Sequence, residues 1–93
     1  DLPQRTSNPP PQPKDPPEPI RLRIDAGGTI TWNNSPMPIS VLQSSLEVEA
    51  ERAMQPTLEI ETDPDAQYEM LAKVLARAKN SGMEKISFVE PGQ

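Results

Sequence analysis

The side chains of this sequence that could take part in chemistry are mostly carboxylates. Glu59 and Glu61 lie two residues apart, and Asp63 and Asp65 follow at the same spacing. Carboxylates spaced in this way can share a hard cation such as Ca²⁺, but the glycine and the bidentate glutamate of a calcium-binding loop are absent from the required positions. Helix capping explains the aspartates better, and exposure on the outer face of a strand explains the glutamates. We therefore predict neither a metal site nor a cofactor.

The residue types that usually activate a nucleophile are missing from the chain. Its 93 residues include no His and no Cys, so the serines have no histidine base and there is no thiolate. Tyr68 is the remaining candidate acid, and we expect it in the core with its hydroxyl group at the rim. The sequence predicts no catalytic residues and a protein that is not an enzyme.

Charge and hydropathy exclude two further classes of partner. The chain carries 9 Lys and Arg residues against 14 Asp and Glu residues, which gives a formal net charge of −5. That charge opposes binding to nucleic acid and to anionic membrane surfaces. No stretch approaches the roughly 20 apolar residues of a transmembrane helix. The chain begins at Asp1 without a methionine, so we expect a fragment or a processed form.

The distribution of proline divides the chain into two parts. Of the 13 prolines, eight occupy positions 3, 9, 10, 11, 13, 16, 17 and 19, and Leu2 is the only other apolar residue among the first nineteen. Such a segment buries too little surface to offset the entropy of ordering, so residues 1–19 are predicted to be a disordered linker with polyproline II character. Its PxxP spacings, such as Pro13-Lys14-Asp15-Pro16, leave a groove-binding motif as an alternative to a plain spacer. Residues 20–93 are predicted to form one small domain.

Alternation of apolar and polar residues predicts four strands in that domain. The first is predicted over residues 20–24, and a turn at 26–28 joins it to a second over 29–32 as a β-hairpin. Two further strands are predicted over 57–62 and 85–89.

Apolar residues at spacings of three and four predict two helices. The first begins at Ile39 with Pro38 in its first turn, buries Leu42 and Leu46, and is ended by Pro56. The order ββαβαβ predicts an α+β fold in which a mixed four-stranded sheet carries both helices on one face. Right-handed crossovers would make strands that flank a helix parallel if they are neighbours in the sheet. The second helix ends at Gly82, and its predicted buried stripe is Tyr68, Leu71, Ala72, Leu75 and Ala78.

The order and spacing of these segments resemble the periplasmic domain of the ExbD/TolR family of biopolymer transport proteins. No single segment is specific to the family, and the sequence departs from its usual pattern at Pro38, where a capping Ser, Thr or Asp is common, and at the acidic pair Glu59 and Glu61. The segments that carry the resemblance are Ile20-Arg21-Leu22-Arg23-Ile24, Ile30-Thr31-Trp32-Asn33-Asn34-Ser35-Pro36-Met37, Leu58-Glu59-Ile60-Glu61-Thr62-Asp63, Tyr68-Glu69-Met70-Leu71 and Ala78-Lys79-Asn80-Ser81-Gly82-Met83-Glu84-Lys85-Ile86-Ser87-Phe88-Val89.

The resemblance implies the periplasmic domain of a single-pass protein of the Gram-negative inner membrane. Its N-terminal transmembrane helix, which bears the family's functional Asp, is missing here, so no acid of this chain inherits that role. Family members form a homodimer inside a pentamer of ExbB or TolQ and use the proton motive force to drive TonB or TolA. ExbD-like members serve TonB-dependent uptake, for instance of siderophores, whereas TolR-like members support outer-membrane integrity and are associated with peptidoglycan. The Pro-rich linker and Tyr68-Glu69-Met70-Leu71 favour the ExbD-like alternative.

Under this interpretation an extended TonB segment adds to an edge of the sheet as a further strand. We expect Leu22→Pro to abolish that addition with less damage to the fold than a proline in a central strand would cause. The predicted partner-binding residues are Ile20, Leu22 and Ile24 on one docking edge and Ile86, Phe88 and Val89 on the dimer-side strand.

Overall fold

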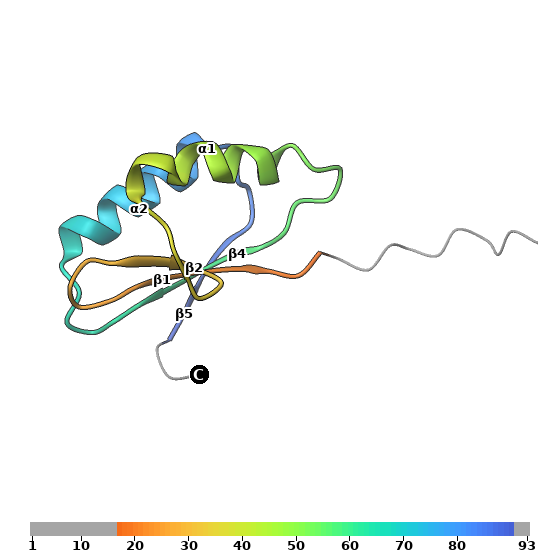
Figure 1. Cartoon of the computed structure of the whole chain (residues 1–93). Helices are drawn as coiled ribbons and strands as arrows, with labels where there is room; N and C mark the ends of the chain where they lie inside the picture. The colour runs from red at the N-terminus through yellow and green to blue at the C-terminus, as the bar shows by residue number, and fades with distance from the viewer. Residues whose placement is uncertain (1–16, 91–93) are drawn as a thin grey trace, which may run out of the picture.

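The computed structural model describes residues 17–90, so the disorder and the groove-binding motif predicted within residues 1–16 lie outside the described part. Figure 1 shows the two helices of this part packed on one face of a sheet, which confirms the predicted α+β class. The elements are β1 (Ile20–Ile24), β2 (Ile30–Trp32), β3 (Ser35–Pro36), α1 (Ile39–Ala50), β4 (Leu58–Thr62), α2 (Tyr68–Asn80) and β5 (Ile86–Val89).

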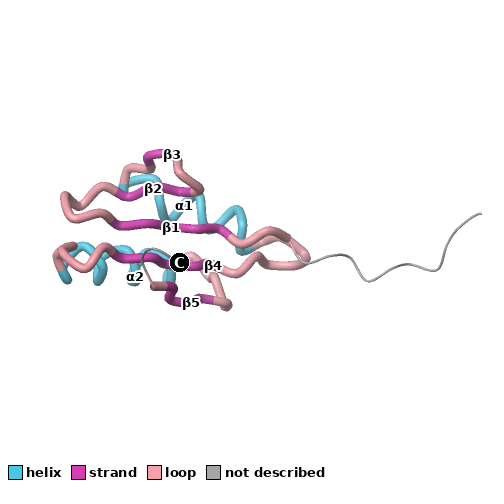
Figure 2. Tube along the Cα trace, turned by 90° about the horizontal axis from the view of Figure 1, so that it is seen from below, coloured by secondary structure: helices cyan, strands magenta, loops and turns pink. Residues whose placement is uncertain are grey.

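The sheet is mixed, and its strands are ordered β3-β2-β1-β4-β5 (Figure 2). β1 is antiparallel to β2 and parallel to β4, and β4 is parallel to β5. The two neighbours that flank α2 are therefore parallel, as predicted. The connection through α1 instead leaves the edge strand β3 and returns to β4, with β2 and β1 lying between them in the sheet.

The core lies between the sheet and the two helices. Alternate residues of β1 and β4 face the helices because side chains of a strand point to opposite faces in turn. The helices also contact each other, so the apolar interior is continuous across the domain. The core residues, all at most 5% exposed, are Ile20, Leu22, Ile24, Ile30, Leu42, Leu46, Leu58, Ile60, Val74, Ala78 and Met83.

The sheet has one strand more than the sequence predicted. Residues 33–36 were expected to be a loop, but Asn33 and Asn34 adopt positive φ angles of 49° and 74°. Two consecutive left-handed residues reverse the chain in the manner of a type I′ hairpin turn, and Asn tolerates that conformation better than most residues. Ser35 and Pro36 therefore return beside β2 and form the short strand β3.

The first helix ends earlier than predicted. It stops at Ala50, well before Pro56, which was expected to end it. The segment after it is fixed by the side chain of Gln55, whose Nε2 donates to the carbonyl oxygens of Ala50 (2.9 Å) and Gly82 (3.1 Å). Its Oε1 accepts the backbone N–H of Glu84 at 2.9 Å. The hydrogen bonds of Gln55 hold the chain beyond this helix, and the side chain of Pro56, which follows, is fully buried.

The start of α2 also differs from the prediction. Its N-cap residue is Gln67, without a side-chain capping bond, so neither Asp63 nor Asp65 caps the helix. Asp63 Oδ1 instead accepts the backbone N–H of Asp65 at 2.8 Å and closes a turn before the helix. At the other end the prediction is confirmed, because Gly82 has a φ of +92° and Met83 packs into the core.

The buried face of α2 is rotated from the predicted one. Tyr68 was expected in the core, but it is 80% exposed. The fully buried residues of α2 are Val74 and Ala78, and Leu71 and Leu75 of the predicted stripe are half-buried against the core. Helical spacing identifies a stripe of apolar residues, yet the packing partners decide which part of that stripe is covered. Here the part of the stripe around Tyr68 is left at the surface.

Candidate partner-binding edge

The two edges of the sheet differ in their capacity to bind another strand. β3 is only two residues long, and Pro36 has no N–H to donate, which are two of the ways in which proteins protect an edge. β5 has four residues and no proline, and within residues 17–90 it pairs with β4 alone. β5 is therefore the edge on which a further strand can be added.

The hydrogen bonds of β5 define which of its backbone groups face outward. The N–H of Leu58 donates to the carbonyl oxygen of Lys85 at 2.7 Å, and Leu58 lies opposite Ile86 in the parallel register. In a parallel ladder a residue hydrogen-bonds to the two residues that flank the one opposite to it. The N–H and C=O groups of that opposite residue therefore point away from the ladder. Because this phase repeats every two residues, Ile86 and Phe88 direct their N–H and C=O groups away from β4.

The first predicted docking edge is not an edge. Ile20, Leu22 and Ile24 belong to β1, which pairs with β2 on one side and β4 on the other. Their side chains are at most 4% exposed. The prediction was wrong because β4 enters the sheet beside β1, a long-range pairing that the alternation of one strand does not specify. These residues build the core and cannot receive an added strand.

The second predicted set does lie on an edge strand. Phe88 is 61% exposed although it shares the helix side of the sheet with Ile60, while Ile86 is half-buried against the core. Val89 is half-buried on the opposite, open face, where it lies next to Glu61. Partner binding by Ile86, Phe88 and Val89 stays a prediction, and their placement is compatible with it.

The open face of the sheet carries a row of ion pairs that sequence reasoning missed. Arg21 Nη2 lies 2.8 Å from Glu59 Oε1, and Arg23 Nε lies 3.2 Å from Glu61 Oε2. Longer contacts continue the row, from Arg21 to Glu61 at 3.8 Å and from Arg23 to Asp63 at 3.7 Å. The parallel register places each arginine of β1 directly opposite a glutamate of β4.

These ion pairs account for the acidic residues Glu59 and Glu61, at which the sequence departs from the usual family pattern. Glu59 and Glu61 were expected to be solvated on an outer face, and they do lie on that face, but their side chains are only 23% and 13% exposed. The neighbouring guanidinium groups cover them. The sequence shows Arg at alternate positions of one predicted strand and Glu at alternate positions of another. The ion pairs could be predicted from these two patterns only if the two strands were known to be neighbours.

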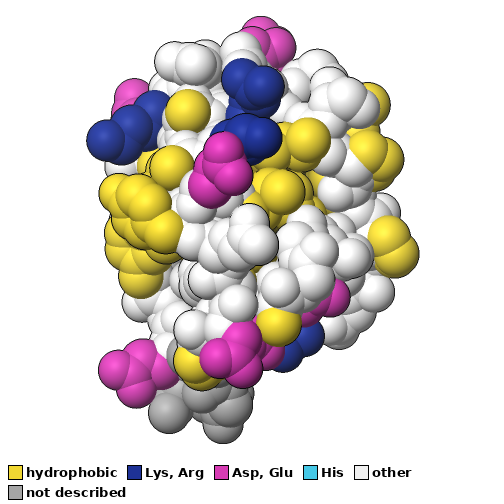
Figure 3. All heavy atoms as spheres, turned by 90° about the vertical axis from the view of Figure 1, so that its left-hand side faces the viewer, with side chains coloured by type: hydrophobic (Ala, Val, Ile, Leu, Met, Phe, Trp, Pro, Cys, Tyr) yellow, Lys and Arg dark blue, Asp and Glu magenta, His cyan; other side chains and the backbone are white. Residues whose placement is uncertain are grey.

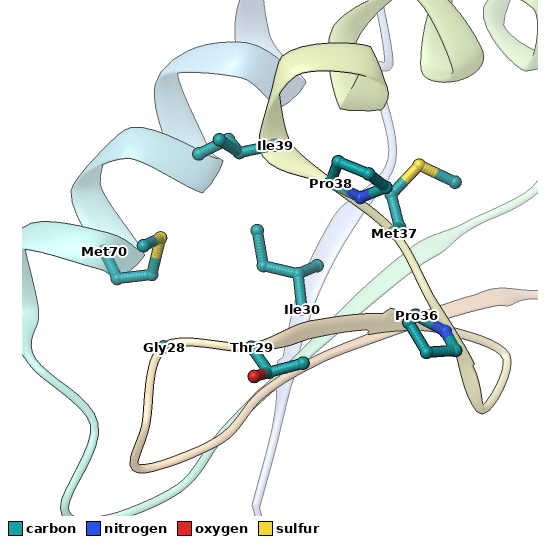
Figure 4. Close-up of a pocket in the computed structure, with 8 residues that line it drawn as sticks. All are labelled: Gly28, Thr29, Ile30, Pro36, Met37, Pro38, Ile39 and Met70. Atoms are coloured by element: carbon teal, nitrogen blue, oxygen red, sulfur yellow. The ribbon is translucent and has the colours of Figure 1, made fainter.

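One apolar cleft opens at the end of the helix layer (Figure 4). It has a volume of about 310 Å³ and lies between the first turns of both helices and the β2 side of the sheet. Ile30, Ile39 and Met70 point toward one another there, and its lining has no titratable side chain. Such a cleft can bind an apolar side chain but supplies no group for acid–base or nucleophilic chemistry.

Across residues 17–90, no three His, Cys, Asp or Glu side chains are grouped so that they could hold a metal ion. The helices in the same range are too short and too polar to cross a membrane.

Comparison with known proteins agrees with the pattern of segments in the sequence. A family model described as "Biopolymer transport protein ExbD/TolR" matches residues 1–92. The "Biopolymer transport protein exbD2" of Xanthomonas campestris pv. campestris is 55% identical over 92 residues, which cover 97% of this chain and 68% of that protein. The "Biopolymer transport protein exbD1" of strain B100 is 30% identical over 78 residues, which cover 81% of this chain and 56% of that protein. The chain therefore belongs to the transport-associated, non-enzymatic ExbD/TolR family, and within it the chain is ExbD-like.

Proposed function

We propose that this chain is the periplasmic domain of an inner-membrane protein that works with ExbB to couple the proton motive force to TonB-dependent outer-membrane transport. The relatives are biopolymer transport proteins, and the more similar of them is an exbD2 protein. The matched region spans 68% and 56% of the two relatives, so each relative is longer than this chain. Roles that need the whole protein are therefore stated here as part of the proposal. They include assembly with ExbB and homodimerisation of the full-length protein in the membrane.

The observation that carries the proposal is that one side of β5 is unpaired within residues 17–90. An extended TonB segment would add to this strand through the outward backbone groups of Ile86 and Phe88, and the backbone would provide much of the affinity. The proline-blocked β3 edge cannot offer the same pattern of donors and acceptors. TonB would therefore bind to one edge of the sheet only, the edge formed by β5.

The test is an amide chemical-shift titration of the labelled domain with a peptide from the TonB periplasmic linker. Saturable shifts concentrated in residues 85–90, with little change in β1, are expected. The same titration with a peptide of scrambled sequence is the control, since nonspecific contact with an acidic domain would shift both samples alike.

The alternative is a TolR-like role in which the domain holds peptidoglycan. Its discriminating assay is co-sedimentation with purified sacculi at moderate salt. Strong retention on sacculi together with absent shifts at millimolar TonB peptide would replace the proposal with that role.

A further inference from the structure

An apolar surface lies beside the outward side of β5 and has no covering element within residues 17–90. It consists of one flank of α2, namely Tyr68, Leu71 and Leu75, together with Ile86 and Phe88 of β5; we call this set the α2 flank. Leu71, Leu75 and Ile86 are half-buried against the core, whereas Tyr68 and Phe88 are 80% and 61% exposed. In Figure 3, hydrophobic side chains lie at the left, in the middle and at the right edge, and the left is the side of α2 and β5.

The rotation of α2 explains why this flank faces the β5 edge. Val74 points into the core, and Met70 lines the cleft that also contains Ile39 of α1, so this side of the helix faces α1. With about 100° between successive residues, Leu71 and Leu75 lie on the other side of Val74 from Met70. They consequently face away from α1, toward the outer strand of the sheet.

We propose that the α2 flank selects the sequence of the strand that adds to β5, and this inference rests on the strand addition of the proposed function. Residues of the added strand that lie opposite Ile86 and Phe88 share their face of the sheet. Those residues come under α2, while the residues between them point to the open, charged face. The selected segment therefore has apolar residues at alternate positions and polar residues between them.

Charge indicates that the occupant is a segment of another protein and not a second copy of this chain. The four charged residues of the first sixteen, Asp1, Arg5, Lys14 and Asp15, cancel, so the whole net charge of −5 belongs to residues 17–93. Antiparallel pairing of β5 with itself, with Ile86 opposite Phe88, would also place Glu84 opposite Glu90, and like charges in that position are destabilising. A segment of another protein avoids both obstacles. Residues 68–90 include four basic and three acidic side chains, so the surroundings of β5 favour neither sign of charge on that segment.

The test uses the folded domain and three synthetic nine-residue peptides. The first alternates valine with lysine and threonine, the second has the same composition with its valines grouped, and the third replaces the lysines of the first by glutamates. Binding is followed by amide shifts of residues 85–90, which report strand addition, and by the dissociation constant, which reports selection. The variants are Tyr68→Ala and, as a matched control, Val48→Ala, because Val48 is an exposed apolar residue (67%) of the other helix.

The first, alternating peptide is expected to bind more tightly than the grouped one. Tyr68→Ala should weaken its binding by about two- to ten-fold, the range expected for the loss of one aromatic contact, and Val48→Ala should leave it unchanged. Two results would overturn selection by the α2 flank and leave strand addition to β5 standing. One is equal affinity for the grouped peptide, and the other is no effect of Tyr68→Ala while the β5 shifts persist. Loss of binding with the acidic peptide would mean that charge, and not the alternation of apolar residues, selects the segment.

Two other outcomes also decide the inference. Absence of β5 shifts with all three peptides overturns it, and a TonB peptide that still binds elsewhere on the domain would keep the proposed coupling to TonB. Concentration-dependent β5 shifts without any peptide, accompanied by a dimer in sedimentation velocity, would assign the edge to a second copy of the chain.

Discussion

Proline substitutions in β1 and β5 are expected to have opposite consequences, and the pair tests the sheet order directly. Leu22 lies in a central strand and is fully buried. Leu22→Pro removes a buried side chain at a cost of about 2 to 5 kcal/mol. It also removes a ladder hydrogen bond and leaves a buried acceptor without its donor, for about 1 to 3 kcal/mol more. A domain of this size is stable by about 4 to 10 kcal/mol, so the variant should be largely unfolded.

Phe88→Pro should leave the domain folded. The side chain is already 61% exposed, and the N–H that it loses points away from β4. The expected destabilisation is about 1 kcal/mol, mainly from the part of the ring that is buried. The same variant should nevertheless stop an added strand, because the outward donor is gone. It thus separates binding from folding, which Leu22→Pro cannot do.

Urea unfolding followed by circular dichroism measures both variants, and the TonB-peptide titration is repeated on whichever is folded. A Leu22→Pro domain with near-native stability would refute the central position of β1. An unfolded Phe88→Pro domain would refute the assignment of its N–H to the outward side, and a folded one that binds peptide as tightly as the unaltered domain would refute strand addition at β5.

Three smaller perturbations test other features of the domain. Gly82→Ala should cost about 1 kcal/mol in urea unfolding, because φ is +92° while the new Cβ would meet Ala50 only at 3.6 Å; no loss would mean that this turn relaxes freely. Glu61→Gln removes the carboxylate between two arginines and should cost up to about 1 kcal/mol at low salt. That difference should shrink in 1 M NaCl, and an equal loss at both salt concentrations would contradict an electrostatic origin. Gln55→Ala removes three hydrogen bonds and should cost about 2 kcal/mol, with faster amide exchange at Glu84; unchanged exchange would contradict the role of Gln55 in fixing the segment after α1.

The sequence was sufficient for features that depend on neighbours along the chain. The alternation in residues 20–24 and 58–62 predicts strands, because the two faces of a strand repeat every second residue. Leu42 and Leu46 predict the buried face of α1 because residues four apart share one side of a helix. Gly82 predicts the end of α2 because a left-handed C′ position suits a residue without Cβ.

The sequence failed where long-range packing chooses among local alternatives. Tyr68 belongs to an apolar stripe, yet the stripe is wider than the face that α1 and the sheet can cover, so the tyrosine remains outside. Asp63 has the chemistry of a helix cap, but the turn before α2 uses its oxygen for Asp65 instead. The pair Asn33-Asn34 was a visible turn signal, and its left-handed angles add the strand β3 that was expected to be loop.

The position of each strand within the sheet was decided only by tertiary structure, and the candidate site depends on it. The amino-acid pattern of β1 suits an edge or a centre equally, since alternation describes the two faces of a strand and not its two sides. Placement of β4 beside β1 buries the first predicted docking edge and pairs its arginines with Glu59 and Glu61. Placement of β5 outside β4 leaves one row of backbone groups unpaired within residues 17–90. What the sequence determined is four of the five strands, both helices and the family. Which strand can meet a partner follows from hydrogen bonds between residues far apart in the chain.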